Sequence, residues 1–181
     1  MVCVVLLAAG LASCATPSVR RDCTSGGYRL LTEVEWEYVA RAGAPRDFIW
    51  PWGNDPAKGC GEANGFDQTT LAAYAGMDTS GYRIFDPFAC NDGWLNTAPV
   101  GSLAPNKFGV FDMIGNVAEW IDGCYTSTHD DIDEHGDCTR RLYKGGSWGT
   151  LAHNTRIAER ITGKPTHRDD SIGIRVARRL R

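Results

Sequence analysis

The sequence lacks three features that would point at once to a class of function. Its formal net charge is only -3, so it has no strongly basic surface of the kind that binds nucleic acid. No Cys-x-x-Cys pair or histidine-rich stretch suggests zinc. The apolar run from Val2 to Ala12 is about eleven residues long, too short for a helix that spans a bilayer. The sequence therefore argues against a nucleic-acid partner, a zinc site and a helical membrane span.

The composition is that of a folded domain. Hydrophobic residues make up 43% and charged residues 23% of the chain, and it contains six tryptophans, so disorder is not expected. A chain of 181 residues has the length of one domain and can bury about two thirds of its unfolded surface. The basic end, Arg178 to Arg181, is expected to be solvated.

The first residues have the pattern of an export signal. Val2 to Ala12 matches a signal-peptide core in length and ends in small residues. Residues 11–14 (Leu-Ala-Ser-Cys) resemble the bacterial lipobox, in which the cysteine is lipidated. This pattern predicts a leader over 1–14 and an exported protein attached to the membrane through Cys14.

Seven cysteines at this length also favour an oxidising compartment. If Cys14 is lipidated and Cys3 is removed with the signal, an odd number remains, so one thiol is free or paired outside the chain. Cys60 with Cys90 is one candidate disulfide.

One helix is well specified by its ends. Thr32 and Glu35 form a capping box, Leu31 and Trp36 occupy the staple positions, and Gly43 is a suitable C-cap. These signals predict a helix over 33–42. Residues on one face of it are expected in the core: Trp36, Val39 and Ala40.

The rest of the chain has weaker signals. Residues 44–105 show no periodicity and are expected to form long ordered loops held by core tryptophans, namely Trp50, Trp52 and Trp94. Residues 121–141 form an acidic insertion that is expected to be solvated. Leu142 to Trp148 predicts a strand that enters a Gly-Gly turn, and Ile172 to Leu180 predicts a closing strand.

The stretch from Phe111 to Trp120 contains two carboxylates around a sharp turn. Asp112 and Glu119 flank Gly115-Asn116, so the backbone can bring their oxygens toward one point, as Ca²⁺ prefers. Alternatively, Asp112 caps a short helix over 115–120 and Glu119 pairs with an arginine.

Five blocks in order resemble the formylglycine-generating enzyme family, also called sulfatase-modifying factor domains. These blocks are Arg29 to Tyr38, Thr97 to Gly101, Gly115 to Trp120, Lys144 to Trp148 and Gly173 to Val176. The resemblance implies an irregular α+β fold related to C-type lectins, with little regular structure and bound calcium. It places the domain over 28–181, without the N-terminal third that family members usually have. It also offers a second interpretation of Val2 to Val4, as the remnant of an extended segment at the start of a truncated domain.

The resemblance assigns residues to two calcium sets. One set comprises Asn64, Gly65, Asp92 and Trp94, with side-chain oxygens from Asn64 and Asp92 and carbonyls from the other two. The other set comprises Asp112, Gly115, Val117 and Glu119, with carboxylates from Asp112 and Glu119. Periplasmic members of the family place cysteines similarly on either side of this loop, which implies a Cys124–Cys138 disulfide.

The resemblance also bears on catalysis. Active family members bind Cu(I) through two cysteines after the Gly-Gly-Ser-aromatic block, and the matching positions here are Thr150 and Thr155. A threonine hydroxyl is a hard oxygen, whereas Cu(I) requires soft sulfur donors. We therefore expect no copper and no formylglycine generation by that mechanism, and whether the chain is an enzyme of another kind stays open.

Three functions remain possible. The first is an exported enzyme that shares the scaffold but not the copper cysteines, as in the periplasmic members associated with pyoverdine maturation, with His153, Glu159 and His167 as candidate proton carriers. The second is a lectin-like module that binds a protein or small molecule through a variable face over 150–171, as in retroelement-diversified relatives. The third is a structural lipoprotein. Residues that would form the ligand face are Trp148, Thr150, His153, Thr155, Arg156 and Arg160.

Overall fold

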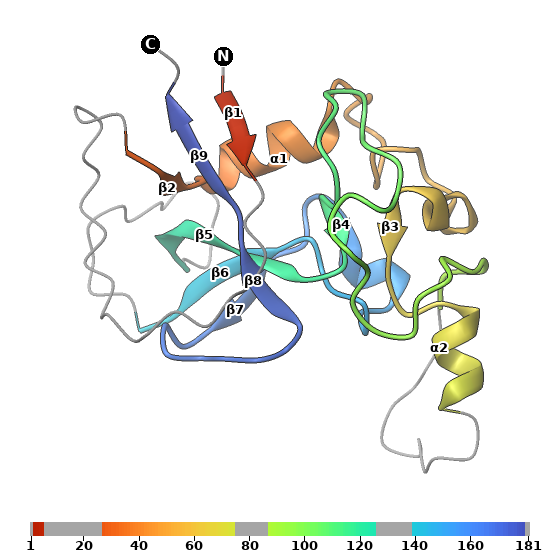
Figure 1. Cartoon of the computed structure of the whole chain (residues 1–181). Coiled ribbons are helices and arrows are strands. Elements are labelled where there is room, and N and C mark those ends of the chain that lie inside the picture. Colours follow the sequence, from red (N-terminus) through yellow and green to blue (C-terminus); the bar gives the residue numbers. More distant parts are fainter. Residues whose placement is uncertain (1, 6–26, 75–86, 126–138, 180–181) are drawn as a thin grey trace.

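The computed structural model of the chain describes residues 2–5, 27–74, 87–125 and 139–179 (Figure 1). Three small sheets organise these residues. They are a three-stranded sheet in the order β1-β9-β2, a pair β3-β4, and a four-stranded sheet in the order β7-β6-β5-β8. In Figure 1 the four-stranded sheet lies below helix α1, while β3, β4 and α2 lie to its right. This mixture of short helices and strands is the expected α+β architecture.

The four-stranded sheet is built around β5. It consists of β5 (Ala118–Cys124), β6 (Arg141–Lys144), β7 (Ile161–Gly163) and β8 (Ile172–Ile174). β5 pairs antiparallel with β6 and parallel with β8. The predicted short helix over 115–120 is wrong, because these residues continue from β4 (Ile114–Gly115) into β5. The acidic insertion also starts later than predicted, since 121–124 belong to β5.

Helix α1 (Glu33–Arg41) packs against this sheet. The capping box is confirmed, because the Thr32 hydroxyl accepts from the Glu35 N–H and the Glu35 carboxylate accepts from the Thr32 N–H. The three predicted core residues are buried. Ala42, with φ of 47° in the left-handed region, is the C-cap instead of Gly43.

The irregular region is held by short elements and by a covalent link. It contains the 3-10 helix η1 (Pro56–Gly61), strand β3 (Ala63–Asn64) and a helix that was not predicted, α2 (Gln68–Ala73). A Cys60–Cys90 disulfide, which confirms that candidate pairing, joins η1 to the segment after α2. Trp50 is buried, as predicted. The prediction that Trp94 is a core residue is wrong, because 37% of its surface is exposed.

Strands β3 and β4 lie unusually close to each other. They pair in parallel, with Asn64 opposite Gly115. Gly115 has φ of +77°, and a Cβ atom added there would lie 1.8 Å from the Asn64 carbonyl oxygen. Only glycine can occupy this position, which joins the two predicted calcium sets.

The C-terminal segment forms two strands instead of the single predicted one. β8 ends at Ile174 and β9 (Val176–Arg179) joins a different sheet, where it pairs with β1 (Val2–Val5) and β2 (Arg29–Leu30). The break falls at Arg175, whose side chain turns inward and is 1% exposed. A further 3-10 helix, η2 (Ala152–Thr155), follows the Gly-Gly turn.

Val2–Val5 are extended in β1, and Cys14 lies outside the described residues. The choice between a remnant and an export leader therefore stays a prediction. Within the residues the structure describes, no helix is long and apolar enough to cross a membrane.

Candidate functional site

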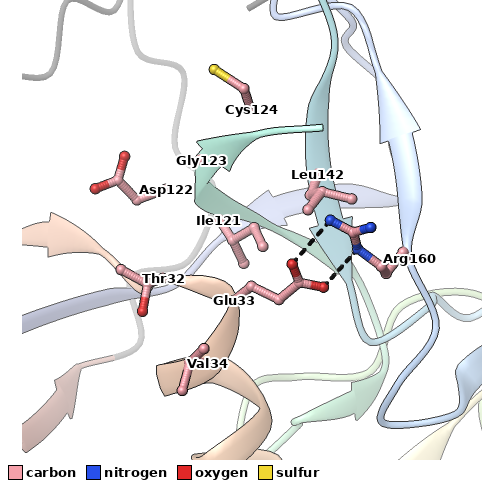
Figure 2. Close-up of a pocket in the computed structure, with 9 residues that line it drawn as sticks. All are labelled: Thr32, Glu33, Val34, Ile121, Asp122, Gly123, Cys124, Leu142 and Arg160. Carbon is pink, nitrogen blue, oxygen red and sulfur yellow. Dashed lines mark hydrogen bonds and ion pairs between the residues drawn. The ribbon is translucent and has the colours of Figure 1, made fainter. Parts of the chain in front are cut away.

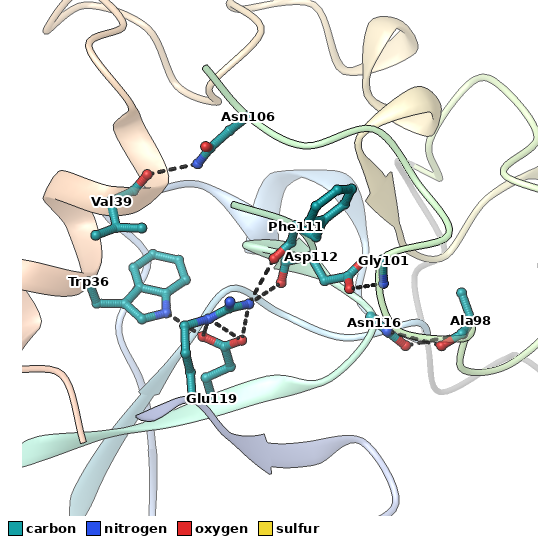
Figure 3. A network of polar contacts seen from close by, with 10 residues as sticks. Trp36, Val39, Ala98, Gly101, Asn106, Phe111, Asp112, Asn116 and Glu119 are labelled. Carbon is teal, nitrogen blue, oxygen red and sulfur yellow. Dashed lines mark hydrogen bonds and ion pairs between the residues drawn. The ribbon is translucent and has the colours of Figure 1, made fainter. Parts of the chain in front are cut away.

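A buried ion pair lies at the centre of the predicted site (Figure 3). The Arg175 Nε donates to both oxygens of Glu119, at 2.8 and 2.9 Å. The Trp36 indole donates to the Glu119 Oε2 at 2.8 Å. The alternative in which Glu119 pairs with an arginine is therefore confirmed. Its carboxylate, 4% exposed, is already surrounded by donors.

Asp112 is linked to this pair through the backbone. The Nη2 atom of the Arg175 guanidinium donates to the carbonyls of Phe111 and Asp112, both at 3.0 Å. Asp112 itself has a left-handed backbone with φ of 54°, and its Oδ2 accepts from the Gly101 N–H at 2.8 Å. The other oxygen, Oδ1, is buried and has no hydrogen-bond donor among the described residues. Asp112 and Glu119 thus meet around Arg175, and their carboxylates have different surroundings.

The turn between β4 and β5 carries the carbonyl members of this set, Gly115 and Val117. Asn116, between them, has φ of 61° and holds the turn by exchanging hydrogen bonds with the backbone of Ala98 (Figure 3). The Gly115 N–H donates to the Gly145 carbonyl at 2.9 Å. The turn between β4 and β5 therefore holds the Asp112 set next to the Gly145-Gly146 turn.

The other predicted set is assembled by a loop that folds over β3. The carboxylate of Asp92 accepts from the Gly65 N–H at 3.1 Å and from the Trp94 N–H at 2.8 Å. The Asn64 side-chain nitrogen donates to the Asn96 carbonyl at 2.9 Å. The structure therefore brings Gly65 and Trp94 to the Asp92 carboxylate, and Asn64 is the residue before Gly65.

The electrostatics of this loop favour an added positive charge. Burial is the largest effect on Asp92 and raises the pKa of its carboxyl, and the nearby charge of Asp67 raises this pKa further, against the two backbone hydrogen bonds. The Asn64 Oδ1 is buried and has no donor in the described part of the chain. A buried amide oxygen without a donor is a ligand type that a hard cation accepts, as is the Asp92 carboxylate.

Calcium would therefore have to use amide and backbone oxygens as well as carboxylates. Among the described residues there is no group of three His, Cys, Asp or Glu side chains that could hold a metal. Each set has one open buried oxygen, which is Oδ1 of Asn64 in one set and Oδ1 of Asp112 in the other. The Asp112 set fits less well, because the Arg175 guanidinium already occupies the Glu119 carboxylate.

Thr150 and Thr155, which the resemblance matches to copper-ligand positions, have structural hydrogen bonds. The Thr155 hydroxyl accepts from the Trp50 indole at 3.1 Å and donates to the Ala152 carbonyl at 2.8 Å. The Thr150 hydroxyl accepts from the Ser147 N–H at 2.9 Å and lies 3.0 Å from the Ser147 hydroxyl. Thr155 has no exposed surface, so its prediction as a ligand contact is wrong.

The remaining members of the predicted ligand face do not form one site. Trp148 is half-buried, while His153 and Arg156 are exposed. Arg156 forms an ion pair with Glu159. Arg160 instead binds Glu33, with its Nε 2.8 Å from the Glu33 Oε1. Arg160 therefore belongs to another part of the surface.

Arg160 lines a cavity of about 260 Å³ at the start of α1 (Figure 2). Its lining residues are Thr32, Glu33, Val34, Ile121, Asp122, Gly123, Cys124, Leu142 and Arg160. The Glu33 carboxylate on its wall also lies 3.4 Å from the buried Lys144 ammonium. Cys124 is disulfide-bonded, while Cys138, its predicted partner, lies outside the described residues. The cavity was not predicted, because its walls are far apart in sequence.

Sequence reasoning also missed the residues that hold the site together, above all Arg175 and Trp50. Arg175 lies within the recognised Gly173 to Val176 block, which was the available signal. For Trp50, no local pattern indicated a hydrogen bond to a residue 105 positions away.

Comparisons with known proteins agree with this architecture. The family model for the sulfatase-modifying factor enzyme 1-like domain matches residues 8–180. The formylglycine-generating enzyme of Streptomyces coelicolor is 32% identical over 163 residues, which cover 83% of this chain and 46% of that protein. The inactive C-alpha-formylglycine-generating enzyme 2 of Bos taurus is 29% identical over 164 residues, 87% of this chain and 46% of that protein. The chain thus spans about half the length of these relatives.

Solved structures show the same fold. PvdO from Pseudomonas aeruginosa aligns with a TM-score of 0.63 and 32% identity, over 84% of this chain and 53% of that one. Treponema denticola variable protein 1 aligns with a TM-score of 0.66 and 27% identity, over 88% of this chain and 50% of that one. Together with the match over 8–180, these similarities show that the chain belongs to the sulfatase-modifying factor family, whose other name is the formylglycine-generating enzyme family.

Proposed function

We propose that this chain is a sulfatase-modifying factor domain that does not carry out copper-dependent thiol oxidation. The observation that supports this most directly is the Thr155 side chain. Its hydroxyl is fully buried and hydrogen-bonded on both sides, to Trp50 and Ala152. A thiolate ligand is therefore replaced by a group that maintains the local structure.

The chemistry of the described cysteines supports the same proposal. Cu(I) is held by soft sulfur, and a protonated hydroxyl at 150 or 155 is a poor substitute. Each of the three cysteines whose side chains the structure describes, Cys60, Cys90 and Cys124, is in a disulfide. None of these three can supply a thiolate without reduction.

We place the protein outside the cytosol, in a role of the PvdO kind. The Cys60–Cys90 disulfide and the bonded Cys124 favour an oxidising compartment. The similarity to PvdO extends over 84% of this chain. Calcium in this proposal is a structural ion that stabilises the loops, and attachment through a lipidated Cys14 would tether the domain to the membrane.

A copper assay tests the proposal. Purified protein is supplied with Cu(I) and a cysteine-containing peptide, and oxygen uptake and loss of peptide thiol are measured. The expected result is no uptake above that of copper and peptide alone. The matched variant, Thr150→Cys with Thr155→Cys, should bind Cu(I) more tightly than the natural chain. Protein-dependent oxygen uptake with matching loss of thiol in the natural chain would overturn the proposal.

A second function, a ligand-binding module, is favoured by one observation. Residues 164–170 are all exposed, and His153 and Arg156 are exposed as well. The fold is shared with Treponema denticola variable protein 1. A binder would give saturable association with a ligand and no turnover, and substitutions within 164–170 would change its affinity without changing thermal stability.

A further inference from the structure

We infer that the outer face of the four-stranded sheet is a docking surface for an acidic, apolar segment of another protein. The outer face is the one opposite α1, and it carries Ile161, Tyr143, Trp120 and Ile174. The inference concerns a protein partner and does not depend on the copper proposal. Three features of this face support it: an apolar row across all four strands, two adjacent arginines beside the row, and the length of the row.

The row follows from the register of the strands, which lie side by side in Figure 1. Ile161 lies opposite Tyr143, Tyr143 opposite Trp120, and Trp120 opposite Ile174. Residues that are paired across strands point to the same face of a sheet. Glu119, the neighbour of Trp120, points to the other face, where it accepts from the indole of α1. The four apolar side chains therefore lie together on the face away from α1.

The centre of the row is a packed aromatic pair. The rings of Trp120 and Tyr143 meet edge to face, with centroids 5.1 Å apart. Gly163 of β7 leaves room for them, because a Cβ atom there would lie 3.2 Å from Tyr143 and 3.3 Å from Trp120. Both aromatic residues and Ile161 are half-buried, and Ile174 at the edge of the row is 49% exposed. The row is thus an ordered apolar surface that is partly open to solvent, and aromatic residues of this kind are enriched at interfaces.

Two adjacent arginines, Arg140 and Arg141, lie beside the row at the start of β6. The Arg141 Nε is buried and has no acceptor in the described part of the chain. Arg140 donates to the neutral hydroxyl of Thr162. Among the described residues, neither arginine forms an ion pair with a carboxylate. A carboxylate from a partner would give Arg141 its missing acceptor and would neutralise charge at the edge of the row.

The acidic group nearest to this place is already engaged. Burial is the largest effect on Tyr143 and raises its pKa, Asp169 raises this pKa further, and the Arg140 charge opposes both. Asp169 therefore lies near the row, but its carboxylate accepts from the N–H and the hydroxyl of Ser171. The two arginines outweigh this single aspartate. Although the chain has a net charge of -3, the edge of the row is locally positive and complements an acidic partner.

The length of the row favours a polypeptide as the partner. Neighbouring strands lie about 4.8 Å apart, so a row across four strands is about 14 Å long. An extended chain covers this distance in about four residues. Small molecules prefer concave sites, and the cavity described above lies elsewhere, at the start of α1. The partner segment would place apolar side chains on the row and Asp or Glu at the arginines.

Selection from a peptide library tests the inference. Random peptides of about twelve residues, long enough to cross the row, are displayed on phage and selected on the full chain. The selected peptides should be enriched in Asp or Glu next to apolar residues. Fluorescence anisotropy should show that Arg140→Gln with Arg141→Gln weakens their binding by about tenfold or more, since charge-assisted contacts are lost. The matched control Arg46→Gln, at an exposed arginine outside this face, should bind as the natural chain does.

A second pair of variants tests the apolar row. Ile174→Ser should weaken peptide binding several-fold, whereas Val34→Ser, at a residue of α1 that is 67% exposed, should not change it. Thermal unfolding checks that each variant is folded. No acidic enrichment, or equal binding by the natural chain and the double arginine variant, would overturn the inference. So would arginine-dependent binding to phosphatidylglycerol vesicles that the selected peptides fail to compete, because the surface would then bind anionic lipid.

Discussion

Single residues decide what the site can do, and Arg175 is the most consequential of them. It ends one strand, neutralises a buried carboxylate and contacts the backbone of the segment that precedes β4. Lys144 has a comparable position, fully buried with its ammonium 2.7 Å from Glu37. The centre of the domain is therefore held by charged contacts as well as apolar ones.

Replacing Arg175 should be strongly destabilising. Arg175→Met leaves Glu119 buried without its partner, and we expect the free energy of unfolding to fall by about 3 to 5 kcal/mol. The matched control is Arg156→Met, which removes an arginine that is 48% exposed and should change stability by less than about 1 kcal/mol. Urea unfolding of both variants gives the comparison. Similar losses in the two variants would contradict a special role for the buried pair.

At the scale of single residues, the sequence predicted which residues belong to the site but not which side chains they contact. It indicated that Glu119 could pair with an arginine, yet Arg175 lies 56 positions away and no spacing rule connects them. The sequence also indicated Thr155, as a residue that stands where active relatives have a copper-binding cysteine. Its burial depends on Trp50, which approaches only in the folded chain.

Elements with local signals were predicted well. Helix α1 has a capping box and an amphipathic face, both of which are properties of consecutive residues. Helix α2 was missed because it has only six residues, although Asp67 caps it by accepting from the Thr70 N–H. The break between β8 and β9 was missed because alternation continues through Arg175, and only tertiary contacts turn that side chain inward.

The start of α1 should lose stability in acid. The hydrogen bond from Arg29, the largest effect, lowers the pKa of Glu35 from its usual 4.5. A lowered carboxyl pKa stabilises the fold above the unfolded value, and this contribution is lost as the pH falls through the folded value. Glu35→Gln should therefore be less stable than the natural chain near neutrality, by less than about 1 kcal/mol because the pair is partly exposed.

Urea unfolding over a range of pH measures this effect. The difference between the natural chain and Glu35→Gln should shrink as the pH falls from 4.5, the usual pKa at which the unfolded carboxyl is protonated, through the lower pKa of Glu35 in the folded chain. A difference that stays constant over this range would assign the effect to packing instead of charge. Thr32→Ala is a useful companion, because it removes the hydroxyl cap and should cost about 1 kcal/mol near neutral pH. Part of this cost should disappear in acid, because the Thr32 hydroxyl also contributes to the lowered pKa of Glu35.

At the scale of the whole molecule, small sheets are joined by buried pairs, aromatic packing and a disulfide. Family resemblance across five blocks predicted this irregular α+β architecture, because those blocks place the turns. Residue patterns alone could not have done so, since long-range pairings such as β5 with β8 join segments about 50 positions apart and have no periodic signature.

The Cys60–Cys90 disulfide should contribute to global stability. It closes a segment with a sequence separation of 30 residues, which corresponds to about 3 to 4 kcal/mol in the chain-entropy account. Replacing both cysteines by alanine should lower the midpoint of thermal unfolding in calcium-free buffer. A double variant with an unchanged midpoint would show that the surrounding aromatic packing holds η1 by itself.

The close approach of Gly115 to Asn64 also limits how this chain can change during evolution. The two backbones touch, so a side chain at 115 would separate β3 from β4 and move both oxygen sets at once. We therefore expect amino-acid substitutions to accumulate in segments away from this backbone contact, such as the exposed residues 164–170. A library randomised over 164–170 should yield mostly folded proteins, whereas one randomised at 115 should retain glycine almost exclusively.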